Sequence, residues 1–204
     1  KKFLQKNNVE ENSITSLISK IILANYNVAI SLTINGKTVY RSAGTGLKNA
    51  IYCVYGADFL KELIQIDAQV NGINIYGYIG KPSFTKHAKT YQTVIVNGRY
   101  VVSDDISYWM YGCYQDFLMK RQFPVFILYI DMPYDLIDVN VHPNKLEVKF
   151  ACSGIIKGLL TNTVKDIINQ NARIAKEISY VNTQQVGEEF ILFDDEPQNT
   201  VEQD

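Results

Sequence analysis

The sequence has 204 residues and a mass of 23.2 kDa, with 20 Lys and Arg against 21 Asp and Glu and an apolar share of 47%. These values fit one ordinary globular unit with a substantial core. The longest apolar run, residues 123–130, is interrupted by Pro124 and falls short of the roughly 20 residues that span a bilayer, which excludes a transmembrane helix. The three Cys lack CxxC spacing and there are only two His, so neither a disulfide framework nor a zinc or other metal site is expected.

The charge is unevenly distributed along the chain. Residues 187–204 contain seven acids and no Lys or Arg, whereas residues 1–186 contain 20 basic and 14 acidic side chains. We therefore expect a folded domain over residues 1–180 and an acidic linker or tail over residues 181–204. The chain starts with Lys1 and Lys2 and no apolar segment follows, so no signal peptide is expected, and the cysteine usage favours a reducing cytoplasm.

The first elements follow from apolar periodicity and from Asn-Gly turns. Residues 13–26 have the i, i+3, i+4 spacing of an amphipathic helix. In residues 28–41, apolar and polar side chains alternate on both sides of Asn35-Gly36, which predicts a hairpin. Residues 47–60 predict a helix that is interrupted at Gly56.

The middle of the chain predicts two further hairpins and a loop between them. The hairpins span residues 63–79, around Asn71-Gly72, and residues 92–102, around Asn97-Gly98. The segment 81–89 is rich in Lys and lacks apolar periodicity, so it is interpreted as an exposed loop.

The last third alternates helix and strand. A helix capped by Asp104 or Asp105 is expected to run to about residue 119, and the apolar segment 125–131 predicts a strand that is buried on both faces. Short strands are expected at 138–141 and 146–150, followed by a helix from 153 to about 178. The order of elements predicts an α+β fold with a mixed sheet and helices packed on one face.

The common enzyme motifs are absent from these residues. There is no GxxxxGK(S/T), GxGxxG, HExxH or GxSxG, which removes the phosphate-loop, dinucleotide, zincin and hydrolase classes. Asp104 and Asp105 could form a catalytic carboxylate pair, but an acidic pair that opens a helix is more often a cap. His142 could act as a general base, yet no nucleophile lies near it in sequence, so a structural role is favoured.

Two sets of basic residues are candidates for phosphate contact. Lys145 lies in a short loop beside Pro143, which would hold its charge in place, although a solvated Lys is the commoner outcome for such a position. Arg99 follows an Asn-Gly turn, and Lys81, Lys86 and Lys89 precede it among several Tyr. This mixture is typical of a single-strand binding surface, but Tyr on strands more often pack in a core.

Residues 138–150, DVNVHPNKLEVKF, resemble the DVNVHPxKxEVRF signature of MutL-type DNA mismatch repair proteins. The resemblance continues through the VNGR of residues 96–99, through FPVF at 123–126 and through the KFL of residues 2–4, and covers residues 1 to about 178. It implies the second, transducer domain of the family's N-terminal half, which has a ribosomal protein S5 domain 2-like fold. The family's ATP-binding motifs and its endonuclease motif do not occur within these residues.

The resemblance also implies roles for individual residues. Lys145 would reach the γ-phosphate of ATP in an adjacent GHKL ATPase domain, where ATP and Mg²⁺ bind, and Asn140, His142 and Pro143 would shape its loop. Arg99 would contact DNA, together with the loop residues Lys81, Lys86 and Lys89. No cofactor is expected to bind to this segment itself. The segment alone would not be an enzyme, but in the full-length protein it would complete a GHKL-type ATPase.

The family also implies partners and a cellular location. The expected partners are the upstream ATPase domain, DNA, a MutS-type mismatch-recognition protein and a second copy of the full-length protein, in a bacterial cytoplasm at the nucleoid and not at a membrane. One alternative remains open from the sequence, a stand-alone nucleic-acid-binding module of the S5-like kind. The transducer of a different GHKL machine, such as a type II topoisomerase, is a third possibility, but the VHPxK context of Lys145 argues against it.

Overall fold

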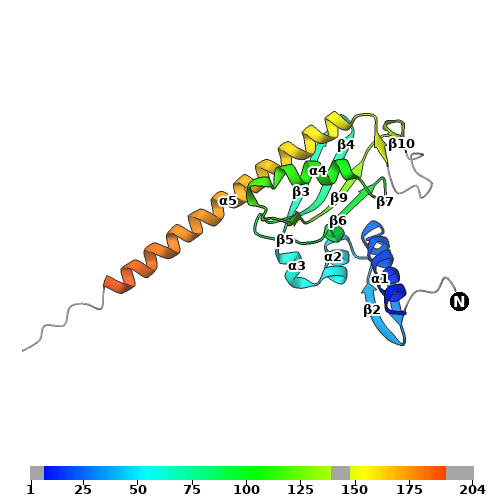
Figure 1. The fold of residues 1–204 in the computed structure, drawn as a ribbon, viewed down its shortest axis with the longest axis horizontal. Coiled ribbons are helices and arrows are strands. Elements are labelled where there is room, and N and C mark those ends of the chain that lie inside the picture. Colours follow the sequence, from blue (N-terminus) through cyan, green and yellow to red (C-terminus); the bar gives the residue numbers. More distant parts are fainter. Residues whose placement is uncertain (1–6, 139–147, 192–204) are drawn as a thin grey trace, which may run out of the picture.

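A mixed five-stranded sheet forms the centre of the molecule (Figure 1). The computed structural model describes residues 7–138 and 148–191. The sheet has the order β3-β4-β9-β6-β7, in which β6 and β9 run parallel and all other neighbours run antiparallel. Its strands are β3 (Leu63–Val70), β4 (Ile73–Gly80), β6 (Gln92–Val96), β7 (Arg99–Val101) and β9 (Phe126–Asp131).

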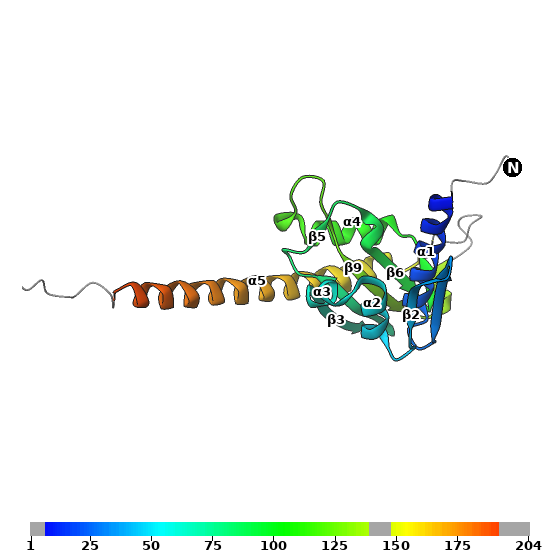
Figure 2. The ribbon, with the colours of Figure 1, turned by 90° about the horizontal axis from the view of Figure 1, so that it is seen from below.

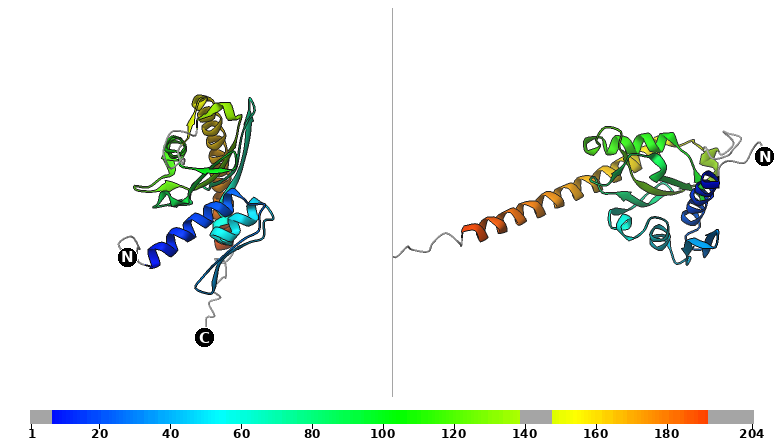
Figure 3. Two further views of the ribbon diagram at one scale, coloured as in Figure 1. Left: turned by 90° about the vertical axis from the view of Figure 1, so that its right-hand side faces the viewer. Right: turned by 60° about the horizontal axis from the view of Figure 1, so that its bottom comes forward.

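Helices cover both faces of this sheet. One face carries α4 (Asp104–Cys113) and α5 (Ser153–Ile191), and the other carries α1 (Asn7–Ala24), α2 (Leu47–Tyr55) and α3 (Ala57–Lys61) (Figures 1 and 3). The α+β class and the mixed sheet are confirmed, but the expectation of helices on one face is wrong. The reason is β9, whose first five residues, Phe126 to Ile130, are all buried and therefore give each face of the sheet its own core.

Neighbouring residues of β9 divide between these two cores. Phe126, Leu128 and Ile130 pack toward α4 and α5, whereas Ile127 and Tyr129 pack toward α1, α2 and α3. All five side chains are buried, since each helix layer excludes water from its side of the strand.

The three Asn-Gly hairpins form as the sequence predicts. Asn35, Asn71 and Asn97 have φ of 50°, 48° and 46°, and each is followed by a Gly of positive φ, the geometry of a type I′ turn. The first turn joins β1 (Ile30–Ile34) to β2 (Lys37–Ser42), which form a separate two-stranded sheet beside α1. The predicted break at Gly56 is also present, between α2 and α3.

Two local predictions need correction. The cap of α4 is Ser103, whose Oγ accepts a hydrogen bond from the Ile106 N–H, while Asp104 and Asp105 lie in the first turn of the helix. This helix ends at Cys113, and a 3₁₀ turn, η2 (Gln115–Phe117), follows it.

The Lys-rich segment 81–89 is not a simple exposed loop. It contains β5 (Thr85–Lys86), which pairs with β8 (Phe123–Pro124), and it ends at the 3₁₀ turn η1 (Lys89–Tyr91). Lys81 and Lys86 are half-buried: Lys81 lies beside Glu62, and Lys86 lies over the rings of Phe84 and Tyr91.

The end of the chain differs from the prediction in the length of its helix. Helix α5 continues to Ile191 and projects well past the sheet (Figure 2), whereas the periodicity predicted an end near residue 178. The division into a domain and a tail at residue 180 therefore falls inside this helix and stays a prediction. No helix in the described ranges is long and apolar enough to cross a membrane.

Candidate functional site

The β6–β7 turn is fastened to the chain that leaves β9. The Asn97 Nδ2 donates a hydrogen bond to the Met132 carbonyl oxygen, and the Met132 N–H donates one to the Asn97 Oδ1, both at 2.9 Å. The Asn97 N–H also donates to the Ile130 carbonyl oxygen at 3.0 Å. Asn97 thus uses its backbone to make the turn and its side chain to fix the turn's position, and Arg99 begins the strand that follows.

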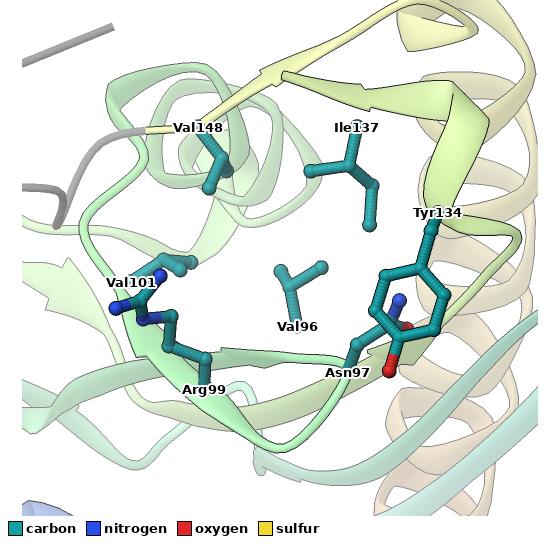
Figure 4. A pocket seen from close by; sticks show the side chains of 7 residues that line it. All are labelled: Val96, Asn97, Arg99, Val101, Tyr134, Ile137 and Val148. Atoms are coloured by element: carbon teal, nitrogen blue, oxygen red, sulfur yellow. The ribbon is translucent and has the colours of Figure 1, made fainter. Parts of the chain in front are cut away.

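A small hollow lies between this turn and the segment after Met132 (Figure 4). It has a volume of about 240 Å³, and we call it the Arg99 hollow; its lining residues are Val96, Asn97, Arg99, Val101, Tyr134, Ile137 and Val148. In Figure 4, Arg99 and Tyr134 stand on opposite sides of the opening, with Val96 between them. Arg99 is exposed and supplies the one cationic side chain of this lining.

The same hollow touches the base of the segment that carries the candidate Lys145. The 3₁₀ turn η3 (Tyr134–Leu136) leads into β10 (Ile137–Asp138), which pairs antiparallel with β11 (Lys149–Phe150). The Ala151 N–H donates to the Leu136 carbonyl oxygen at 3.0 Å and extends this stem. Asn140, His142, Pro143 and Lys145 lie between the two strands and outside the described residues.

The other predicted DNA-binding residues lie elsewhere and have contacts of their own. Lys81 Nζ is 3.4 Å from Glu62 Oε2. Lys86 Nζ lies 4.4 Å from the centre of the Phe84 ring, and Lys89 Nζ lies 5.7 Å from that of Phe123, so both make cation–π contacts.

Arg99 and these three lysines are at opposite ends of β6. Lys89 precedes Gln92, which pairs with Phe126, whereas Arg99 pairs with Val96 at the far end of the strand. Four residue steps separate the two ends, about 13 Å at roughly 3.3 Å per residue. The structure therefore does not bring the four basic residues together at one point.

Lys20 is a basic residue that the sequence did not single out. Its Nζ donates hydrogen bonds to the Thr93 Oγ1 at 2.8 Å and to the Thr90 carbonyl oxygen at 3.3 Å, and it lies 5.5 Å from the centre of the Tyr100 ring. Burial lowers the pKa of Lys20 to about 8. Because Lys20 and Thr93 are 73 residues apart, no local pattern could have predicted this contact.

Among the described residues, the Arg99 hollow combines an exposed cation with an apolar lining. No group of three or more His, Cys, Asp or Glu within them could hold a metal ion. The Arg99 hollow is mostly apolar and smaller than the roughly 300 Å³ at which small-molecule pockets begin, so ATP with its metal does not fit there. Its exposed guanidinium can instead bind a phosphate oxygen at the surface.

Comparison with protein families identifies the chain. The family described as "DNA mismatch repair protein, C-terminal domain" matches residues 51–169, more than half of the sequence. The chain belongs to this mismatch repair family. The matched residues run from α2 into α5 and include the whole five-stranded sheet, the Arg99 hollow and the β10–β11 stem.

Curated relatives place the chain among MutL-type proteins. The DNA mismatch repair protein MutL of Clostridium botulinum strain Langeland is 35% identical over 182 residues, which are 83% of this chain and 27% of the relative. MutL of Desulforamulus reducens is 32% identical over 170 residues, 83% of this chain and 27% of the relative. The mismatch repair chain thus spans about a quarter of the length of these relatives.

Solved structures agree on the fold. A crystal structure of the N-terminal domain of a DNA repair protein matches with a TM-score of 0.66 at 24% identity. The match covers 80% of this chain and 55% of the chain in that structure. The ATPase domain of Aquifex aeolicus MutL, described as a mismatch repair endonuclease, has a TM-score of 0.55 at 16% identity, with the same coverage. The predicted S5 domain 2-like fold is confirmed by this MutL-type architecture.

Proposed function

We propose that this chain is the transducer part of a MutL-type mismatch repair protein. In this proposal Lys145 reaches the γ-phosphate of ATP in an adjacent GHKL ATPase domain, and Arg99 contacts the DNA backbone. Asn140, His142 and Pro143 shape the Lys145 loop, and the acidic residues 181–204 form a linker or tail. The partners proposed with it are DNA, a MutS-type protein and a second copy of the full-length protein.

The single observation that supports coupling between the two sites is the paired hydrogen bond between Asn97 and Met132. It joins the turn before Arg99 to the chain segment that leads to β10, and both line the Arg99 hollow. A displacement of the β10–β11 stem when Lys145 meets a γ-phosphate would therefore press on the Arg99 turn. This gives a short physical route by which bound ATP can change the presentation of a DNA-binding residue.

The lysine role is tested in the parent protein that contains the upstream ATPase domain. Lys145→Ala should lower ATP turnover about 10- to 1000-fold, because a positioned charge that stabilises the transferring phosphate is lost. Lys149→Ala is the matched control, since it removes another lysine of the same stem, exposed on β11. Unchanged turnover in Lys145→Ala with an intact fold would contradict the assigned role.

The DNA role is tested by salt titration of duplex binding in the same protein. Arg99→Ala should weaken binding and reduce the slope of log K against log salt by about 1, the loss expected for one phosphate contact. Arg41→Ala, an exposed arginine of β2, should leave the slope unchanged. If the 204-residue chain alone binds DNA as tightly as the parent protein does, the stand-alone module becomes the better description.

A further inference from the structure

Lys20 is a partly buried cation that has no carboxylate partner among the described residues. Its two hydrogen bonds go to uncharged oxygens, those of Thr90 and Thr93. The ion pairs within residues 7–138 and 148–191 are Lys61–Asp58 and Lys81–Glu62, and neither involves Lys20. A partly buried ammonium without a carboxylate is unfavourable in the free protein, and an anion that reaches it would relieve this cost.

An open groove gives access to this ammonium. It lies between α1 and β7, has a volume of about 570 Å³ and is lined by polar and apolar side chains, none of them acidic. We call it the Lys20 groove; Asn12, Ser13, Ser16 and Lys20 form its polar lining, and Tyr100 lies across from them. Glu11 of α1 accepts a hydrogen bond from the Asn35 side chain of the β1–β2 turn, outside this lining.

Strand β7 connects the groove to the Arg99 hollow. Successive residues of a strand point to opposite faces, and here Tyr100 lines the Lys20 groove while Arg99 lines the hollow on the other side. Strand β7 is also the edge of the five-stranded sheet. A charged backbone that passes along this edge would meet one cation on each side of it.

We infer that the Lys20 groove binds a phosphate group of a nucleic-acid backbone, as a second contact beside Arg99. This inference rests on the proposed function, since it extends the DNA contact from one residue to an edge of the sheet. Hydroxyl and amide side chains are common donors to phosphate oxygens, and a lysine supplies the charge. The lowered pKa of Lys20, about 8, leaves most of the side chain protonated at neutral pH. An anion in the groove would raise that pKa.

Binding of a labelled DNA duplex by the parent protein tests the groove directly. Lys20→Met removes the charge and keeps an unbranched side chain of similar length, and it should weaken binding about 3- to 10-fold and reduce the salt slope by about 1. Lys37→Met, at an exposed site on β2, is the matched control and should change neither. An unchanged slope would overturn the inference.

The same experiment separates the two proposals. If Arg99→Ala reduces the slope of log K against log salt by about 1 and Lys20→Met does not, the proposal for the Lys20 groove is wrong and the DNA role of Arg99 stands. If neither variant changes the slope, the DNA surface proposed for this edge fails as a whole.

Acylation of Lys20 distinguishes the source of the phosphate. In the wild-type protein, trace labelling with acetic anhydride near pH 8 should modify Lys20, and the DNA duplex should protect it several-fold more than Lys37. Inorganic phosphate and ATP at the same phosphate concentration should protect it little. Protection by ATP or inorganic phosphate but not by DNA would overturn the nucleic-acid assignment in favour of a free phosphate ligand.

Discussion

Asn97 combines two tasks in one residue, a left-handed backbone and a side chain that bonds to another segment. Asn97→Gly keeps the left-handed conformation without strain and removes only the two bonds to Met132. The variant should lose about 1–3 kcal/mol of unfolding free energy, the usual range for a part-buried donor and acceptor left without partners. Urea titration followed by circular dichroism measures the change.

Asn71→Gly provides the control for this comparison. Asn71 has nearly the same φ and is also followed by Gly, but the described residues give its side chain no hydrogen bond. Its substitution should therefore change the stability by only a few tenths of a kcal/mol. Equal losses for the two variants would show that the turn conformation, and not the bond to Met132, carries the effect.

Lys20 should give the unfolding free energy a characteristic pH dependence. The pKa of Lys20 is about 8 in the folded chain, and its ordinary value of 10.5 applies to the unfolded chain. Between these two pH values the unfolded state therefore binds more protons than the folded state. Stability should therefore rise as pH increases from 8, and the difference in unfolding free energy between wild type and Lys20→Met should shift in favour of wild type by about 2 kcal/mol between pH 7.5 and 9.5. Urea titrations of both proteins from pH 7.5 to 9.5 measure it.

The upper limit of pH 9.5 keeps nearby tyrosines from obscuring this result. Burial raises the pKa of Tyr100, which contacts Lys20, and raises that of Tyr55 to about 12. These groups act in the opposite direction, because the unfolded tyrosines lose their protons first and stability then falls above about pH 10. A difference that stays flat from pH 7.5 to 9.5 would mean that Lys20 is not desolvated.

At the level of elements, α4 shows how one residue decides where a helix begins. The Ser103 Oγ accepts the bond from the Ile106 N–H, so Ser103→Ala should cost about 1 kcal/mol of unfolding free energy. Asp104→Asn and Asp105→Asn should each cost only a few tenths, since they remove a favourable interaction with the helix dipole and no cap. Thermal unfolding of the three variants, compared in one buffer, ranks them. A larger loss for either aspartate variant would restore the cap predicted from the sequence.

The elements that the sequence predicts well are those whose signal is local. The Asn-Gly turns, the break at Gly56 and the buried strand β9 each depend on a few consecutive residues, and all three are present. The sequence does not single out the cap of α4, because Ser103, Asp104 and Asp105 are all good capping residues and differ only in their backbone conformation. The pairing of β5 with β8 and the contact of Lys20 with Thr93 join segments far apart, which no local pattern encodes.

In the candidate site too, the sequence predicts the residue that has a local motif but not the contacts that depend on the tertiary fold. Arg99 could be proposed from a short motif, and its place on an exposed edge strand agrees with a role in binding. Only closeness in sequence links the loop lysines 81, 86 and 89 to Arg99. Strand β6 separates these lysines from Arg99 in space. Their ammonium groups contact Glu62, Phe84 and Phe123. Periodicity gave the class of fold but not the second helix layer, because an apolar strand does not reveal what covers each face.

On the scale of the whole molecule, β9 belongs to both cores and should make them unfold together. Ile127 and Leu128 are both fully buried and face opposite layers, so Ile127→Ala and Leu128→Ala should each cost about 2–5 kcal/mol. Trp109, the one Trp of the sequence, packs against the core on the Leu128 side. Its fluorescence should nevertheless report the loss at Ile127, with a denaturation midpoint that matches the midpoint from circular dichroism. Val39→Ala, at an exposed position of β2, should move neither midpoint. If Ile127→Ala leaves the Trp109 midpoint unchanged while the ellipticity falls in an earlier step, the two faces unfold separately and β9 does not couple them.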